Sequence, residues 1–264
     1  RRRLLIAAGF LFTVSAIWTA LAWDYTSFNL ARITGGIGIG LASNLSPMYI
    51  AEIAPAEIRG VFVSINQLTI VIGILAAQIT NLLIAQPVPQ DIPPEQIVEF
   101  IRQSWNGQLG WRWMFGAETV PAVGFFLLMF FVPESPRWLV KWGNDSLAER
   151  ILARVGGTDY ARRAVAEIRQ TLSAEEIARV RLSDLWEPRL VRVLALGVFL
   201  AVFQQWCGIN VIFNYAQDVF QAAGYAVSDV LINIVFTGIV NLVFTFVAIF
   251  TVDRWGRRIL MLFG

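Results

Sequence analysis

Residues 61–85 read VFVSINQLTIVIGILAAQITNLLIA and contain no charged side chain. About 20 residues of helix, at a rise of about 1.5 Å per residue, are enough to cross the hydrocarbon core of a bilayer. This segment is therefore predicted to be a transmembrane helix. Gln67, Gln78 and Asn81 fall within about 60° of one another on a helical wheel, so the helix is expected to carry one polar face inside the membrane.

Similar segments lie on either side of this one, at residues 4–22, 28–50, 113–132, 193–217 and 230–252. All six together contain only two charged residues, Arg32 and Glu118, although the chain has 21 basic and 19 acidic residues. Charged side chains are costly in the hydrocarbon core of a bilayer, so membrane spans exclude them in this way. The fold of a soluble globular protein does not require such segregation of charge. The sequence predicts an all-α membrane protein with six spans.

The composition excludes several classes of catalytic and cofactor site. The chain has no histidine and a single cysteine, Cys207, so serine–histidine catalysis, imidazole metal sites and internal disulfides are ruled out. The sequence contains no phosphate-binding P-loop, and the glycines at 36, 38 and 40 lie inside an apolar span rather than at a strand-to-helix turn. We expect no enzyme activity, no cofactor, no metal and no nucleic-acid partner.

Basic residues concentrate at the start of the chain, near residue 59, in the loop 133–192 and after residue 253. By the positive-inside rule, these regions and both ends of the chain are predicted to be cytoplasmic. The chain begins with Arg1 and stops within a further apolar run, 259–264. We therefore expect it to be part of a longer protein.

The loop 133–192 is rich in charge and contains helix-start patterns. Capping boxes begin at Ser146 and Ser173, and Asp159 is a third candidate start. These patterns predict short helices. Two interpretations are open: a solvated linker with marginal helices, and a helical latch that lies under the membrane domain.

The two charges inside the spans are candidates for a functional role. Arg32 and Glu118 lie at similar depth in the second and fourth spans. Because a charge inside a bilayer is costly, each is expected to face a partner or a cavity. They could pair with each other, each could face a helix outside this chain, or Arg32 could snorkel to the interface.

Uncharged polar residues form further faces in the last two spans: Asn233, Thr237 and Asn241 in one, and Gln204, Gln205, Gly208 and Asn210 in the other. A glycine among amides predicts a broken helix that lines a water-filled cavity. Amides donate and accept hydrogen bonds, so such a cavity suits a neutral, polyhydroxylated ligand. The alternative is hydrogen bonding between packed helices, and the small residues Gly36, Gly40 and Ser43 are expected to serve packing.

Ordered motifs over nearly the whole chain carry a family resemblance. They are Arg32-x-x-x-Gly36-x-Gly38-x-Gly40, Pro47-Met48-Tyr49-Ile50-Ala51-Glu52, Arg59-Gly60, Gly110-Trp111-Arg112, Pro133-Glu134-Ser135-Pro136-Arg137-Trp138-Leu139, Gln204-Gln205-x-x-Gly208-Ile209-Asn210 and Asp253-Arg254-Trp255-Gly256-Arg257-Arg258. The chain resembles the sugar porter family of the major facilitator superfamily, and its pattern is similar to that of bacterial xylose–proton symporters.

The resemblance implies a twelve-span fold in two six-helix halves. Residues 1–132 would then hold spans three to six, 133–192 a cytoplasmic helical linker, and 193–264 spans seven, eight and the start of nine. By the same resemblance, the side chains that contact the sugar are Gln67, Gln204, Gln205, Asn210 and Asn241. Arg32 would take part in proton coupling, and Glu118 is the other intramembrane charge.

The resemblance also implies a charge network outside the membrane, formed by Glu52, Arg59, Glu134, Arg137, Asp253, Arg254, Arg257 and Arg258. Such a network would hold the two halves together when the cavity opens outward and release them when it opens inward. Arg1 departs from the family pattern, which usually has glycine at that position.

We therefore expect transport of a pentose or a hexose by alternating access. Proton-coupled symport is favoured, and a facilitated-diffusion uniporter or a non-transporting sugar sensor are the alternatives. The expected partners are a monosaccharide, protons and the lipid bilayer of the cell membrane, and the protein is expected to be a monomer.

Overall fold

The computed structural model describes residues 1–55, 59–87, 89, 94–177, 188–206, 208, 215, 227–256 and 259, and every regular element among these residues is a helix. The helices at predicted spans are α1 (Arg2–Ala20), α2 (Tyr25–Ile53), α3 (Arg59–Ile84), α5 (Trp111–Ala117), α6 (Thr119–Leu128), α9 (Pro188–Trp206) and α12 (Val227–Trp255). The others are α4 (Pro94–Gln103), the π-helical turn η1 (Asn106–Gly110), α7 (Pro136–Lys141) and α8 (Asp145–Ile177). For the described residues, the all-α prediction is confirmed.

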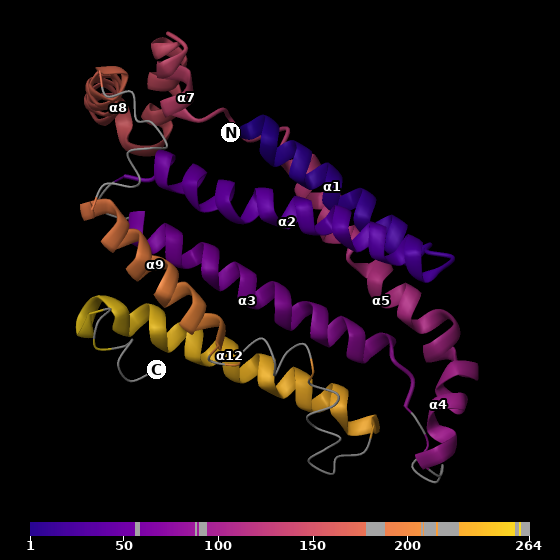
Figure 1. The fold of residues 1–264 in the computed structure, drawn as a ribbon. Helices are drawn as coiled ribbons and strands as arrows, with labels where there is room; N and C mark the ends of the chain where they lie inside the picture. Colours follow the sequence, from indigo (N-terminus) through magenta and orange to yellow (C-terminus); the bar gives the residue numbers. More distant parts are fainter. Residues whose placement is uncertain are drawn as a thin grey trace.

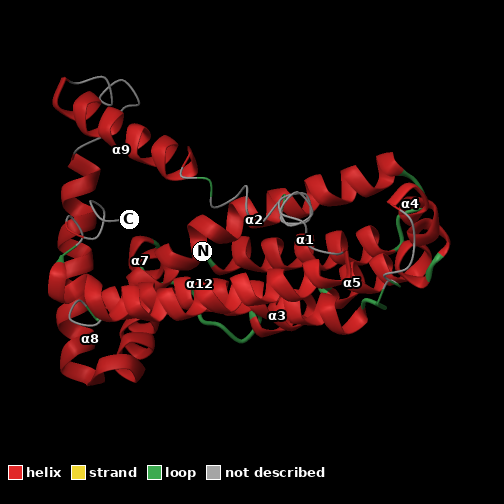
Figure 2. Ribbon diagram, turned by 90° about the horizontal axis from the view of Figure 1, so that it is seen from below, coloured by secondary structure: helices red, strands yellow, loops and turns green. Residues whose placement is uncertain are grey.

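The long helices run side by side as a bundle (Figure 1, Figure 2). α1 packs against α2, α5 and α6, and α3 packs mainly against α12. Because α3 precedes the charged loop and α12 follows it, the bundle joins the two parts of the chain. α1 begins and α12 ends on the side of the bundle where α7 and α8 lie (Figure 1).

Among the described helices, Arg2–Ala20, Gly60–Ile84 and Val230–Thr251 are long and apolar enough to cross a membrane by themselves. α2 has 29 residues, as many as α12, but its glycines and polar residues such as Arg32 and Asn44 lower its mean hydropathy. α9 contributes a shorter apolar stretch, Leu190–Trp206.

The fourth predicted span, residues 113–132, is two helices rather than one. α5 ends at Ala117 and α6 begins at Thr119, so that Glu118 lies at the junction. Pro121 explains the interruption, because a proline nitrogen cannot donate to the carbonyl four residues earlier, here that of Ala117. The charged residue of this span therefore lies where the helical hydrogen bonding is broken.

α1 and α2 approach closely where α2 lacks a side chain. A Cβ on Gly35 would lie 2.5 Å from Ser15 Oγ, and the Ser15 hydroxyl donates to the carbonyl of Ala31 at 2.8 Å. Gly36 and Gly40 have no described neighbour within 4 Å of where a Cβ would be. These two glycines therefore do not lie at the α1–α2 contact, because α2 turns a different face toward α1. Their expected role in close helix packing stays a prediction.

The described part of the charged loop folds into α7 and α8, which pack against each other. Leu139, Val140 and Ala148 form the buried centre of this unit. Gly157 interrupts α8 with a φ of +84°, a backbone conformation that glycine adopts without steric cost. A shared core of this kind favours the latch interpretation over a linker with marginal helices.

Two of the three predicted helix starts in this loop lie at observed boundaries. α8 begins at Asp145, beside Ser146, and its second stretch follows Gly157, close to Asp159. The start predicted at Ser173 is wrong, since α8 continues through it to Ile177. A capping pattern inside a helix that has already formed upstream extends that helix, because elongation is easier than nucleation.

The fifth predicted span, residues 193–217, is interrupted near its middle. α9 ends at Trp206 and Gly208 has a φ of +83°, as the glycine among the amides predicts. Cys207, 209–214 and 216–226 lie outside the described residues.

Candidate functional site

Two of the candidate sugar-contacting amides lie on a pair of packed helices. Gln67 lies on α3 with its side chain exposed, and Asn241 is half-buried on α12. α3 and α12 pack along each other, and Gln78, on the polar face predicted for α3, has a buried amide oxygen. The structure therefore places the two predicted polar faces on neighbouring helices.

The amides of α9 do not lie beside those of α3 and α12. Gln204 and Gln205 lie exposed in the last turn of α9. In the described part of the chain, α9 has no extended packing interface with α3 or α12. Asn210, the remaining candidate, lies outside the described residues.

The two intramembrane charges form an ion pair. Arg32 Nη1 on α2 lies 3.7 Å from Glu118 Oε2 at the α5–α6 junction, and each side chain is about half exposed, 48% and 50%. The Arg32 guanidinium also lies 5.4 Å from the ring centre of Phe115. A cavity of about 290 Å³ beside Glu118 is lined by Phe12 and Pro121, among others. Of the alternatives that the sequence left open, mutual pairing is the one observed.

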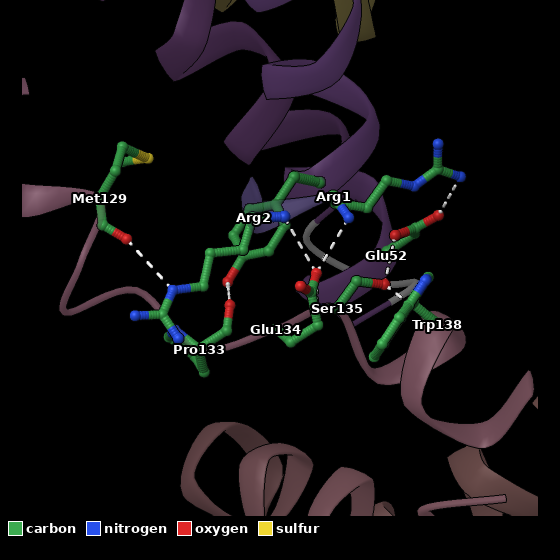
Figure 3. A network of polar contacts seen from close by, with 9 residues as sticks. Arg1, Arg2, Glu52, Met129, Pro133, Glu134, Ser135 and Trp138 are labelled. Carbon is green, nitrogen blue, oxygen red and sulfur yellow. Dashed lines mark hydrogen bonds and ion pairs between the residues drawn. The ribbon is translucent and has the colours of Figure 1, made fainter. Parts of the chain in front are cut away.

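Glu134 joins the link between α6 and α7 to the first turn of α1 (Figure 3). Its Oε1 accepts hydrogen bonds from the amino-terminal ammonium group of Arg1 and the backbone nitrogen of Arg2, at 3.0 Å each, and from the backbone nitrogen of Ser135 at 3.1 Å. Burial raises the pKa of the Glu134 carboxyl, but the backbone N–H groups of Arg2 and Ser135, together with the charged amino terminus at Arg1, outweigh burial and leave the pKa below its usual value. Glu134 is therefore held as a carboxylate.

Glu52, in the last turn of α2, binds two other segments (Figure 3). Arg1 Nη2 lies 2.9 Å from Glu52 Oε1, and the Ser135 hydroxyl donates to Glu52 Oε2 at 2.5 Å. Ser135 is fully buried, and its Oγ also accepts a bond from the first turn of α7. The Tyr49 hydroxyl donates to the carbonyl of Pro133 at 2.7 Å. The end of α2 is thus tied to the link that precedes α7.

A cavity of about 790 Å³ lies between the end of α2 and α8. Its charged lining consists of Arg1, Glu52, Arg137, Arg163 and Glu167. Arg137 therefore lies at the same cavity as Glu52. A cavity lined by both signs of charge suits the docking of another charged segment.

The structure does not describe the side chains of several other predicted members of the charge network. Arg59 begins α3, and Asp253 and Arg254 belong to the last turn of α12, but their side chains lie outside the described part of the structure. Arg257 and Arg258 lie outside the described residues altogether.

Sequence reasoning missed four members of this network: Arg1, Arg2, Tyr49 and Ser135. Ser135 could have been found, because a serine followed by proline is a common start of a helix. The roles of Arg1 and Arg2 depend on residues more than 50 positions away, and one sequence gives no signal for such pairs.

Comparison with known proteins covers the chain from end to end. The family model described as "Sugar (and other) transporter" matches residues 1–264. The chain is 42% identical over 244 residues to the D-xylose-proton symporter of Escherichia coli (strain K12), which covers 92% of this chain and 46% of that protein. It is 37% identical over 264 residues to the arabinose-proton symporter of Bacillus subtilis (strain 168), which covers 100% of this chain and 54% of that protein. The chain thus spans about half the length of the curated relatives it matches.

Solved structures are similar over the same extent. The proton:xylose symporter XylE bound to 6-bromo-6-deoxy-D-glucose has a TM-score of 0.80 and 39% identity, over 97% of this chain and 54% of that chain. The partially occluded, inward-open form of the xylose transporter XylE from E. coli has a TM-score of 0.78 and 38% identity, over 97% and 57% of the two chains.

Proposed function

This chain belongs to the sugar transporter family of the major facilitator superfamily, and from that membership we propose that the whole protein moves a monosaccharide across the cell membrane by alternating access. The transported class is a pentose or a hexose, and the transport is symport with protons. The two relatives described above are a D-xylose-proton symporter and an arabinose-proton symporter. In this proposal the protein is a monomer, and both ends of residues 1–264 are cytoplasmic.

The observation that carries the proposal is the packing of α3 against α12. These helices bear Gln67 and Asn241, and they lie on opposite sides of the charged loop in sequence while packing together in space. If 1–132 and 193–264 belong to different halves, this interface lies between the halves. Amides on such an interface would bind sugar hydroxyls and would be exposed to each side in turn as the halves rock.

Proton coupling is supported by the Arg32–Glu118 pair. A carboxylate that pairs with arginine inside a membrane loses that pairing when it takes up a proton, and intramembrane acids commonly serve as proton relays. The half-exposed Glu118 side chain remains accessible to such a proton.

The charge network around Glu52 and Glu134 would act as the conformational latch. It ties α1, α2 and α7 together at one end of the bundle. Of its remaining members, Arg59 would join the network from the same half, and Asp253, Arg254, Arg257 and Arg258 would complete it from the other half. Breaking and remaking the ion pairs would then accompany opening and closing.

The test is uptake of labelled pentoses and hexoses by the full-length protein in proteoliposomes, with and without an imposed proton gradient. We expect saturable uptake of at least one sugar and accumulation only with the gradient. Absence of saturable uptake for every sugar of the panel would refute transport. Uptake that the proton gradient does not change, and that never exceeds the outside sugar concentration, would refute symport.

The amide assignment is tested with Gln205→Ala. Loss of a hydrogen bond to a sugar hydroxyl is expected to weaken the apparent affinity about tenfold, with unchanged protein yield. Gln108→Ala, which removes an exposed amide from η1, is the matched control and should leave the affinity unchanged. Equal affinities in the two variants would remove Gln205 from the site.

A further inference from the structure

Gly238 of α12 lies buried directly against Gln78 of α3. A Cβ at position 238 would overlap the Gln78 amide oxygen, and it would lie 3.1 Å both from the Gln78 carboxamide carbon and from a Leu75 methyl. Small residues at helix interfaces in membranes let backbones approach in this way. With the Gln78 side chain in its observed position, there is no room for a side chain at position 238.

Among the described residues, the hydrogen bonding of this contact is incomplete. Gln78 Oε1 is buried, and it has no hydrogen-bond partner among the described residues. The nearby hydroxyl on α12, that of Thr237, already donates to the carbonyl of Asn233 at 2.8 Å. A buried amide acceptor without a partner has given up its bond with water and received none in return.

We infer that Gln78 and Gly238 form a gate contact between the two halves, closed by complementary shape and made easy to open by the unpaired amide oxygen. The inference rests on the proposed function, because α3 and α12 lie in different halves only in that scheme. When the helices separate, water or a sugar hydroxyl donates to Gln78 Oε1. The new hydrogen bond offsets part of the packing that is lost, so the closed contact is short-lived.

The first test is a pair of substitutions that disrupt and restore the fit. In Gly238→Ala the new methyl group displaces the Gln78 carboxamide from its observed position, so the gate contact closes less tightly. In Gly238→Ala combined with Gln78→Ala, the shortened side chain leaves room for the methyl group. Gly73→Ala on α3 is the matched control, because a Cβ there has no described neighbour within 4 Å.

Closure is read from cysteine labelling, which does not depend on transport. Asn81 lies one turn from Gln78 on the same face of α3, so Asn81→Cys in a Cys207→Ser background of the full-length protein reports water access. We expect a water-soluble maleimide to label the Gly238→Ala protein about five times faster than the parent, and the double variant within about twofold of the parent. Parent-like labelling of Gly238→Ala, or fast labelling of the double variant, would overturn the inference.

The second test addresses the unpaired oxygen. Gln78→Leu keeps the bulk of the side chain but removes the polar group, so the closed contact becomes more stable. We expect Asn81→Cys labelling to slow about fivefold in this variant, and sugar uptake to slow with it. Labelling as fast as in the parent would refute the role of the amide oxygen. If the variants show the expected labelling rates but the parent protein takes up no sugar, the gate contact stands and the proposed function is refuted.

Discussion

Arg32 Nη1 lies 3.7 Å from Glu118 Oε2, and the acid of this pair occupies the junction between α5 and α6. Pro121 removes a helical hydrogen bond next to that junction. The acid is thus placed where the helix is interrupted, and the arginine comes from a separate helix. Because the two charges lie 3.7 Å from each other, a change in protonation of the acid acts directly on the arginine.

For Glu118→Gln, we expect proton-driven sugar accumulation to fall at least about tenfold, because the side chain can no longer gain or lose a proton. Sugar exchange without a gradient should persist, since the amide keeps the size of the side chain. The measurement is uptake in proteoliposomes with an imposed proton gradient, compared with counterflow. Glu99→Gln is the control, because Glu99 is an exposed acid of α4; equal loss in both variants would contradict a coupling role.

Ser135→Ala should destabilise the link between α6 and α7. The substitution removes the bond to Glu52 and the cap of α7 at a site that is 0% exposed. We expect a loss of about 1–2 kcal/mol, seen as a lower apparent Tm of the full-length protein in detergent. Ser146→Ala, at an exposed position in the first turn of α8, should leave the Tm unchanged. An unaltered Tm in Ser135→Ala would show that the buried hydroxyl contributes nothing to the stability of the fold.

The lowered pKa of Glu134 predicts a pH dependence of stability. Because the folded pKa lies below the unfolded value of about 4.3, the carboxylate stabilises the fold above that value. The stabilisation is lost as the pH falls through the folded pKa. The apparent Tm of the wild-type protein should therefore exceed that of Glu134→Gln at neutral pH, and the difference should shrink below about pH 4. A difference that is constant with pH would contradict the prediction.

Gly35→Ala and Gly36→Ala form a matched pair on adjacent residues of α2. A methyl group at position 35 would displace the Ser15 side chain, whereas one at position 36 meets no described atom within 4 Å. We expect Gly35→Ala to cost about 1–3 kcal/mol through overpacking, and Gly36→Ala to be neutral or slightly stabilising. Thermal unfolding of the two variants in parallel measures the difference, and a larger loss in Gly36→Ala would contradict the observed packing face.

Much of the architecture follows from local properties of the sequence. Exclusion of charge predicts the spans, and comparison with solved structures confirms the expected partial major facilitator fold. The turn at Gly208 also follows from a glycine among amides. The break at Glu118 was missed, although Pro121 signals it, because hydropathy averaged over a window does not register a single lost hydrogen bond.

The contacts between distant residues were harder to predict. The Arg32–Glu118 pair could be proposed since charges inside a membrane have few possible partners. Outside the spans, Glu52 and Glu134 had many basic residues to choose from, and the choice of Arg1 and Arg2 depends on how the helices pack. For the same reason, the contact of Gly35 with α1 could not be predicted, because sequence spacing does not say which face of α2 meets α1.

Two contacts described above determine whether the intervening chain crosses the membrane an even or an odd number of times. Tyr49 bonds to Pro133 and Glu52 bonds to Ser135, so the chain leaves α2 and returns to the same end of the bundle. The number of crossings between residues 53 and 133 must therefore be even. α3 is one of them, and α5 with α6, although interrupted at Glu118, together count as the other. This parity is set by two hydrogen bonds and holds whatever the hydropathy of the individual helices.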